Sequence, residues 1–363
     1  MDLLDIQEYK KDIELVASLD LPWEMLNNSS ILVSGATGLV GSFLVDVLMW
    51  KNINDNMRCQ IYALGRNEER ARKRFDKYLD SKSLTIVSCD INAADAYDIL
   101  QKKVGRADYV VHLASNTHPV AYASDPIGTI LTNILGTKAL LDFSADNKSK
   151  RFAFASSNEI YGENRGDIEK FDENYCGYIN SNTLRAGYPE SKRCGEALCQ
   201  AYNKQRGLDV VIPRITRSYG ATLLGSDTKA LSQFLKKAIA GEDIVLKSEG
   251  LQHYSYLYVA DTVAGLLTVL LKGVCGEAYN ISDESSDIRL KELASIVAKS
   301  VGKEVVFEIP DAVESAGFSK VTKALLDNSK IAKELGFKAS YDIKTGIEKT
   351  VRIMKQLSES ENY

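Results

Sequence analysis

Tyr188 and Lys192 are separated by four positions, in the segment Tyr-Pro-Glu-Ser-Lys. On a helix this spacing puts both side chains on one face, one turn apart. A lysine ammonium favours the charged form of a nearby phenol, so the pair predicts that the pKa of Tyr188 falls from about 10 toward neutral pH. Such a tyrosine is a general base for the hydroxyl group of a sugar or a steroid. The pair alone is a weak signal, and the sequence upstream of it strengthens it.

A glycine-rich turn with the sequence Gly-Ala-Thr-Gly-Leu-Val-Gly occupies residues 35–41. It follows the apolar run Ile31–Val33, which predicts a buried strand, and it opens the apolar-periodic stretch Phe43–Leu48, which predicts a helix. In such a strand–turn–helix unit the glycines permit a tight turn, close approach of the backbone to a pyrophosphate, and close packing of helix on strand. The N-terminus of the helix then faces the anion. The segment therefore predicts a dinucleotide-binding site.

Four more motifs follow in order along the chain. Asp90 and Ile91 come after a predicted strand, and residues 112–115 read His-Leu-Ala-Ser at the end of another. Asn133 lies in the segment Asn-Ile-Leu-Gly-Thr, and Ser157 lies in Ser-Ser-Asn-Glu-Ile-Tyr-Gly. With the glycine turn and the Tyr-x-x-x-Lys pair, this combination resembles the extended short-chain dehydrogenase/reductase family.

That resemblance implies a nicotinamide cofactor and assigns residues to it. The implied cofactor-binding residues are Gly35, Thr37, Gly38, Leu39, Gly41, Arg66, Asp90, Ile91, Leu113, Ala114, Ser115, Asn133, Tyr188 and Lys192. The implied catalytic residues are Ser157, Tyr188, Lys192 and Glu159.

The length of 363 residues is too great for one core and suggests two lobes. Apolar runs alternate with helical patterns up to about residue 215, which predicts an α/β fold: a Rossmann-type doubly wound parallel sheet with a smaller α/β substrate-binding cap. We expect an N-terminal helical extension at 1–30 and a dinucleotide-binding domain at 31–213 that is rejoined at about 255–273. The cap is expected to comprise 214–254 and 274–363. The segment Tyr256–Val259 is expected to return to the edge of the large sheet.

Composition narrows the class of protein. The net charge of −4 gives no indication of nucleic-acid binding, and no apolar stretch is long enough to span a membrane. The sequence begins Met-Asp-Leu-Leu-Asp, which is no signal peptide, so we expect a cytoplasmic protein. Six cysteines show no Cys-x-x-Cys spacing and three histidines are scattered, so no metal site is expected.

The end of the second predicted strand bears on the choice of cofactor. Proteins that prefer NAD carry an acidic residue there, which binds the adenosine ribose. Here the strand runs into Gly65, Arg66 and Asn67, so the carboxylate is missing. Arg66 either binds the 2′-phosphate of NADP or stacks on adenine with either cofactor. The sequence slightly favours NADP over NAD.

Within the family, several segments resemble UDP-glucuronate decarboxylases. These are the stretch from His118 to Tyr122, residues 173–180, and the segment from Arg185 to Lys192. The triplet Ser-Asn-Glu at 157–159 resembles their Thr-Ser-Glu, whereas 4,6-dehydratases have an aspartate at the position of Asn158 that protonates the departing hydroxyl. The residues expected to bind substrate are His118, Asn158, Arg185, Arg217 and Tyr254.

Two of these residues depart from the family pattern. Relatives have asparagine at the position of Arg217 and a diphosphate-binding arginine at the position of Tyr254. Arg217 either takes over the phosphate charge while Tyr254 stacks on a base or sugar, or the substrate is not a usual nucleotide sugar. A third alternative is that Arg217 pairs with a carboxylate such as Asp227.

The expected function is modification of a nucleotide sugar through a transient 4-keto sugar and a bound nicotinamide cofactor, leaning to decarboxylation of the UDP-glucuronate type. Tyr188 would take the proton of the 4-hydroxyl, Ser157 would stabilise charge on that oxygen, and Glu159 would steer protons near C5 or C6. Arg185 would hold a carboxylate or phosphate of the substrate, and the alternative is that it forms a surface salt bridge. The alternative for Glu159 is a buried structural carboxylate. The alternatives are a 4-epimerase or 4,6-dehydratase and, more remotely, a non-catalytic dinucleotide sensor. The resemblance also implies a homodimer formed through helices expected at about 125–142 and 188–204.

Overall fold

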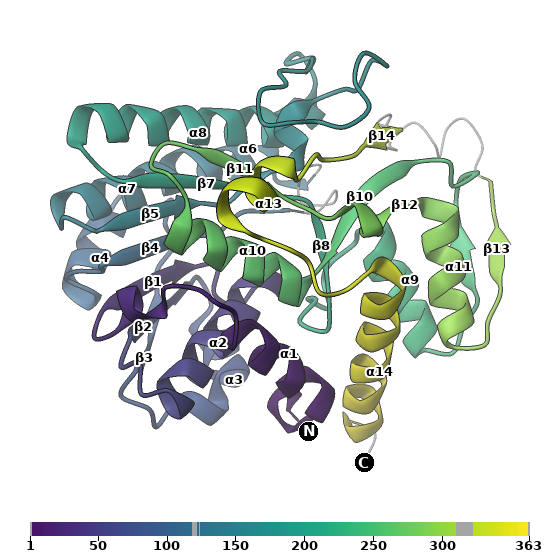
Figure 1. Cartoon of the computed structure of the whole chain (residues 1–363), viewed down its shortest axis with the longest axis horizontal. Helices are drawn as coiled ribbons and strands as arrows, with labels where there is room; N and C mark the ends of the chain where they lie inside the picture. The colour runs from purple at the N-terminus through teal and green to yellow at the C-terminus, as the bar shows by residue number, and fades with distance from the viewer. Residues whose placement is uncertain (1, 118–121, 123, 310–321, 362–363) are drawn as a thin grey trace.

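The computed structural model of the chain describes residues 2–117, 122, 124–309 and 322–361. Its centre is a large parallel sheet with the strand order β11-β7-β5-β4-β1-β2-β3, to which β6 adds a short pairing with β7 (Figure 1). The strands are β1 (Ser30–Ser34), β2 (Gln60–Gly65), β3 (Leu84–Ser88), β4 (Tyr109–His112), β5 (Arg151–Phe154), β6 (Ser156–Ser157), β7 (Val210–Ile215) and β11 (Ala278–Ile281). The order reverses between β1 and β4, where ligands bind in folds of this kind. The predicted Rossmann-type doubly wound sheet is confirmed.

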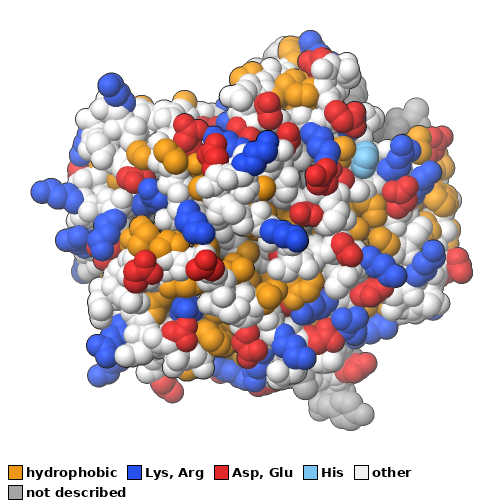
Figure 2. Space-filling model, in the orientation of Figure 1, with side chains coloured by type: hydrophobic (Ala, Val, Ile, Leu, Met, Phe, Trp, Pro, Cys, Tyr) orange, Lys and Arg blue, Asp and Glu red, His pale blue; other side chains and the backbone are white. Residues whose placement is uncertain are grey.

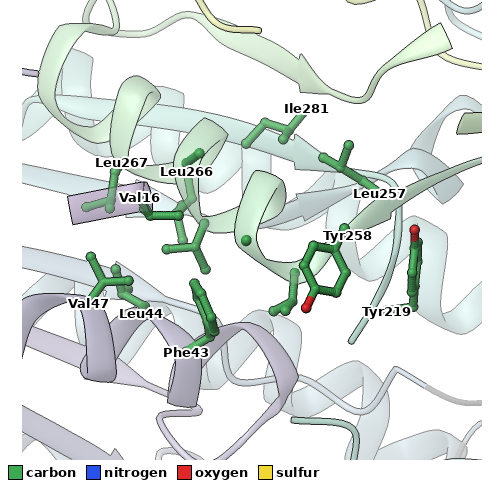
Figure 3. Packing of buried hydrophobic residues seen from close by; sticks show 14 of the residues in the cluster. Val16, Phe43, Leu44, Val47, Tyr219, Leu257, Tyr258, Leu266, Leu267 and Ile281 are labelled. Atoms are coloured by element: carbon green, nitrogen blue, oxygen red, sulfur yellow. The ribbon is translucent and has the colours of Figure 1, made fainter. Parts of the chain in front are cut away.

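Alternate residues of β1 face two separate cores, as expected for a strand covered on both sides. Ile31 and Val33 belong to a core with α2 (Leu39–Asn54) and α10 (Val259–Lys272), and Leu32 belongs to the other. The second core includes residues of α4 (Ala96–Lys103), α7 (Thr137–Asp146) and α8 (Gly187–Arg206). Figure 3 shows side chains of α2 and α10, with Val16 from the N-terminal region, in the first core.

A second, smaller set of strands lies beside the large sheet. Its four-stranded sheet comprises β8 (Arg217–Tyr219), β10 (His253–Tyr258), β12 (Asp287–Arg289) and β14 (Lys323–Ala324), and β9 (Ile244–Leu246) pairs with β13 (Val305–Phe307). Around it lie α9 (Ala230–Ile239), α11 (Leu290–Ser300) and α14 (Ile343–Glu361), while α13 (Ser329–Leu335) lies by β11 (Figure 1).

The expected return of Tyr256–Val259 to the large sheet is wrong. Tyr256 pairs with Arg217 of β8, within the second sheet, and the edge of the large sheet is β11, in which Ala278 pairs with Ile212. Both β10 and β11 are short apolar runs before a helix or a turn. The sequence pattern alone therefore does not show which of the two pairs with the large sheet. The division of the chain into an extension, a cofactor domain and a cap stays a prediction.

The first 30 residues contain the predicted helix, α1 (Gln7–Ala17), between the 3₁₀ turns Leu3–Asp5 and Trp23–Leu26. The apolar face of α1 is buried against α2, α10 and α14. Remaining elements are α3 (Glu68–Arg74), α6 (Pro126–Leu131), the π-helical turn η4 (Thr132–Gly136), and the 3₁₀ turns at Asp76–Tyr78, Asn158–Tyr161, Leu184–Ala186 and Glu284–Ser286. On the face in Figure 2, acidic and basic side chains are interspersed. No helix of the described residues has the length and apolar character needed to cross a membrane.

Candidate active site

The glycine turn closes tightly against the end of β4. Gly35 has a φ of +67°, and a Cβ atom there would lie 2.8 Å from the backbone nitrogen of Ala114. A Cβ on Gly41 would lie 2.3 Å from the carbonyl oxygen of Gly35. Leu39 begins α2, and the residue before it, Gly38, supplies no side-chain cap for the first-turn N–H groups. Those N–H groups therefore need an external acceptor, and a pyrophosphate suits them.

His112 fixes the opposite wall of this turn. Its Nδ1 lies 2.7 Å from Ser34 Oγ and its Nε2 lies 3.0 Å from Thr137 Oγ1. Complete burial lowers the pKa of His112 to about 3, so the ring stays neutral. The backbone N–H groups of Leu113 and Ala114 donate to Ser34 Oγ. These contacts hold Leu113 and Ala114 against Gly35, and that both residues bind a cofactor stays a prediction.

A chain of hydrogen bonds joins this wall to α8. Ser115 Oγ donates to Asn133 Oδ1 at 2.8 Å, and Asn133 Nδ2 donates to Ser191 Oγ at 2.9 Å. Ser191 Oγ in turn donates to the carbonyl oxygen of Tyr188 at 2.9 Å. Asn133 lies in the π-helical turn η4, and such turns recur at functional sites. The structure therefore brings Asn133 to the position where the α6–η4–α7 segment meets α8.

Ser157, Tyr188 and Lys192 are all buried at one place. Lys192 Nζ donates to the carbonyl oxygen of Ala155 at 2.8 Å, and burial lowers the pKa of Lys192 to about 8. Burial and the carboxylate of Glu159 raise the pKa of Tyr188, although hydrogen bonds from Ser157 and Ser115 favour the phenolate. The predicted lowering of the Tyr188 pKa is therefore wrong, because the cost of desolvating a phenolate exceeds the effect of the neighbours.

Glu159 and Arg185 form an ion pair beside Tyr188. Nη2 of Arg185 lies 2.8 Å from both carboxylate oxygens of Glu159. The guanidinium also lies over the ring of Tyr122, at 4.8 Å from its centre, and that ring is 4.9 Å from the ring of Tyr188. Arg185 is exposed and Glu159 is partly buried, so the guanidinium is accessible to an incoming anion that competes with Glu159.

Arg217 and Tyr254 meet on the strands β8 and β10. The guanidinium carbon of Arg217 lies 3.8 Å from the centre of the Tyr254 ring. Nη1 of Arg217 is buried and has no hydrogen-bond partner. Asp227, the alternative partner, pairs instead with Lys229 at 3.5 Å. A buried guanidinium N–H without an acceptor is costly, so Nη1 of Arg217 is suited to a water molecule or an anion, and the predicted role of Arg217 in binding substrate stays a prediction.

The other predicted residues differ in how far they are buried. Asn158 is buried beside Ser157, Ile91 is buried, and Asp90 and Arg66 are exposed. His118 lies outside the described residues. No group of three or more potential metal ligands is present among the described residues.

Two residues of the site had no predicted role. The ring of Tyr122 packs against that of Tyr188 with a tilt of 30° between the ring planes, and the place of Tyr122 in the segment beginning at His118 was the only signal. Arg70 donates to the carbonyl oxygen of Thr37 at 3.1 Å, within the glycine turn. Arg70 lies in a run of basic residues, which is typical of a solvated helix face, so its position in the sequence gives no signal of a role in the site.

Residues 31–282 match the family described as the NAD dependent epimerase/dehydratase family. The chain belongs to this family, as predicted, and is an enzyme of its kind. It is 29% identical over 279 residues to UDP-glucuronic acid decarboxylase 5 of Arabidopsis thaliana, covering 77% of this chain and 76% of the relative. It is 26% identical to UDP-glucuronic acid decarboxylase 1 of Danio rerio, covering 89% of this chain and 72% of that one.

Solved structures share the fold. A double mutant of dTDP-glucose 4,6-dehydratase from Streptomyces venezuelae, with NAD bound, superposes with a TM-score of 0.77 at 25% identity, covering 91% of this chain and 98% of that one. UDP-glucuronic acid 4-epimerase from Bacillus cereus, in complex with UDP-glucuronic acid and NAD, superposes with a TM-score of 0.76 at 22% identity, covering 90% and 99%.

Proposed function

We propose that the chain modifies a nucleotide sugar through a transient 4-keto sugar, and that its reaction is a decarboxylation of the UDP-glucuronate type. The observation that carries the proposal is the joint burial of Ser157, Tyr188 and Lys192 beside the Glu159–Arg185 ion pair. The relatives named UDP-glucuronic acid decarboxylase support it further.

The glycine turn, the Leu113–Ser115 wall and Lys192 would hold the nicotinamide cofactor. When bound, an oxidised nicotinamide supplies a hydride acceptor for C4 of the sugar and a positive charge that lowers the pKa of Tyr188. Tyr188 takes the proton of the 4-hydroxyl group, and Ser157 donates a hydrogen bond to the same oxygen as charge develops on it. The product of this step is a 4-keto sugar.

The ketone makes loss of the C6 carboxylate easy. The electrons of the C5–C6 bond move to the C4 oxygen as carbon dioxide leaves, and Ser157 and Tyr188 stabilise the enolate. A proton delivered by way of Glu159 then takes the place of the lost carboxylate on C5, and reversal of the first step restores the C4 hydroxyl. Arg185 holds the carboxylate before it leaves. Asn158 has no proton to give to a departing hydroxyl, which disfavours 4,6-dehydration.

Arg217 and Tyr254 bind the far end of the substrate in this proposal. The unpartnered Nη1 of Arg217 donates a hydrogen bond to a diphosphate oxygen, and the Tyr254 ring packs against the guanidinium. Arg185 thus binds the carboxylate of the substrate, and Arg217 binds its diphosphate.

Incubation with a panel of nucleotide sugars, followed by mass spectrometry and NMR, tests the function. Loss of carbon dioxide from UDP-glucuronate is the expected outcome. Loss of water would instead identify a 4,6-dehydratase, and unchanged mass with altered ring couplings a 4-epimerase. The absence of any conversion with either cofactor would favour a dinucleotide sensor. The presence of Ser157, Tyr188 and Lys192 argues against a sensor, because dinucleotide binding alone does not need all three residues.

The cofactor is NAD or NADP, with a lean to NADP from Gly65 and Arg66. We also propose a homodimer through the α6–η4–α7 and α8 helices. Ile127 and Leu184 are 71% and 74% exposed there, and Leu131 and Leu135 are exposed nearby, so a second copy would cover an apolar surface. A monomeric mass by light scattering at micromolar concentration would contradict this.

A further inference from the structure

The 3₁₀ turn Asn158–Tyr161, which carries Glu159, is tied to two strands of the large sheet. At its start the backbone N–H of Glu159 donates to Oγ of Ser157, in β6, at 3.2 Å. At its end the hydroxyl oxygen of the buried Tyr161 accepts a hydrogen bond from Nη1 of Arg214, in β7, at 2.9 Å. The two ends of the turn are therefore fixed relative to the sheet.

The middle of this turn is tied to α8 by Arg193. Arg193 directly follows Lys192 in the sequence, and its Nε donates to the carbonyl oxygen of Ile160 at 2.7 Å. Its Nη2 donates to the carbonyl oxygen of Gly177, also at 2.7 Å. The backbone of Gly177 lies directly against the turn, since a Cβ there would be 2.0 Å from the carbonyl oxygen of Tyr161. One guanidinium therefore joins α8 both to the turn and to the segment packed against it.

The segment packed against the turn leads on to Arg185, the partner of Glu159. Ser181 in this segment donates to Oε1 of Glu190, on α8, at 3.0 Å. The same carboxylate oxygen lies 3.8 Å from Nη1 of Arg193, so the guanidinium makes its shorter contacts to main-chain oxygens. This face of α8 therefore holds both of the chain segments that bring the ion pair together.

From this arrangement we infer that Arg193 is a positioning residue, which fixes the Glu159 carboxylate beside Tyr188 for the proton transfer assigned to Glu159. A guanidinium presents its donors in a rigid planar fork, so it holds two carbonyl oxygens in a fixed relation as a lysine ammonium does not. Displacement of a reacting group by about 1 Å costs on the order of a hundredfold in rate. The inference rests on the proposed function, because it deepens the role of Glu159 in that reaction.

Steady-state kinetics of Arg193→Met test the inference, because methionine keeps much of the aliphatic packing and has no donor. We expect kcat to fall about ten- to a hundredfold with KM nearly unchanged, the pattern of a contact that acts on the reaction and not on substrate binding. Glu159→Gln should have the larger effect, and the double variant should be no slower than Glu159→Gln alone. Effects of the two changes that multiply would overturn the inference, since a merely structural arginine acts independently of Glu159.

Arg193→Lys separates the geometry of the fork from its charge, and it also serves if Arg193→Met does not fold. Its rate should lie well below that of the wild type, because one ammonium does not span both carbonyl oxygens. A rate equal to that of the wild type would show that charge alone suffices and would overturn the inference. Arg206→Met is the matched control, since Arg206 is exposed at the end of the same helix and pairs with Asp146. It should keep the wild-type kcat, and a loss as large as that of Arg193→Met would also count against the inference.

Amide hydrogen exchange separates this inference from the proposed function, because it needs no substrate. Arg193→Met should exchange faster than the wild type at residues 158–163, where the N–H of Gly162 donates to the Glu159 carbonyl oxygen and that of Glu163 to the Tyr178 carbonyl oxygen. Unchanged exchange there would reject the positioning role whatever reaction the enzyme catalyses. Faster exchange, together with a wild type that does not convert UDP-glucuronate, would reject the proposed function and keep the role of Arg193 in holding the turn.

Discussion

The guanidinium of Arg217 lies over the ring of Tyr254, with 3.8 Å between the guanidinium carbon and the ring centre. The two residues come from neighbouring parallel strands of the second sheet, in which Arg217 is directly opposite Tyr256. The Arg217 side chain therefore extends along β10 from the position opposite Tyr256 to Tyr254, two residues earlier on that strand. This places a positive charge over the position at which relatives carry their own arginine.

Arg217→Ala is expected to weaken binding of UDP by about ten- to a hundredfold and to leave binding of the dinucleotide unchanged, because a charge-assisted contact to a diphosphate is lost. Thermal melts with and without UDP measure this. The variant should melt as the wild type does and no longer be stabilised by UDP. A lowered melting temperature with an unchanged response to UDP would show a structural role instead.

Tyr188→Phe is expected to lower turnover by about 10²–10⁴-fold, the range of general-base catalysis, and to retain cofactor binding. The ring still packs against Tyr122, whereas the proton acceptor is gone. Lys192→Ala should impair both turnover and cofactor binding. Tyr202→Phe, on the same helix but bonded to Asp142, is the control and should keep full activity. A Tyr188→Phe variant with more than about a tenth of the wild-type rate would contradict the role of the base.

His112 is expected to make the chain less stable as the pH falls. Its pKa is about 3 in the folded chain and 6.5 when unperturbed, so between these values the unfolded chain binds a proton that the folded chain does not. The contribution of His112 to the free energy of unfolding is fully present above pH 6.5 and is lost progressively as the pH falls below that value. From pH 7 to pH 5 the loss from this residue is about 2 kcal/mol.

Urea unfolding of the wild type and of His112→Asn at pH 7 and pH 5 measures this loss. The variant should be less stable at pH 7, because a buried hydrogen bond is altered, but should lose less stability on going to pH 5. An equal loss in both proteins would contradict a neutral buried His112.

Asp12→Ala is expected to destabilise the fold by about 3–5 kcal/mol, because it leaves the buried Lys349 ammonium without its carboxylate. Asp12 is fully buried and also accepts hydrogen bonds from the hydroxyls of Tyr258 and Tyr341. The control is Glu8→Ala, on the same helix, which removes a partly exposed pair with Arg352 and should cost less than about 1 kcal/mol. Chemical unfolding compares them, and similar losses would show that the buried carboxylate has no special role.

The sequence predicted the features that depend on neighbours along the chain. The glycine turn, its flanking strand and helix, and the Tyr188–Lys192 spacing are local patterns, and the structure has each of them. The pairing of β10 with β8 was not predicted, because Tyr256 and Arg217 meet only through tertiary packing. The raised pKa of Tyr188 has the same origin, since burial arises from the whole fold. Within the site, the Glu159–Arg185 pair and the Arg70–Thr37 bond join residues 26 and 33 positions apart, beyond the reach of helical or strand periodicity.

The helix α1 lies ahead of the family match at 31–282, yet its carboxylates Glu8 and Asp12 contact Arg352 and Lys349 of α14, beyond the other end of that match. The recognisable sequence unit and the cooperative folding unit therefore have different boundaries. A chimera that exchanged only residues 31–282 with a relative would keep both ends of the chain while changing Tyr258, Asp46 and Arg74, which bond to α1. Such exchanges should succeed when the residues that make these three contacts come from the same protein as α1. Exchange of either end of the chain must likewise keep α1 and α14 from one protein.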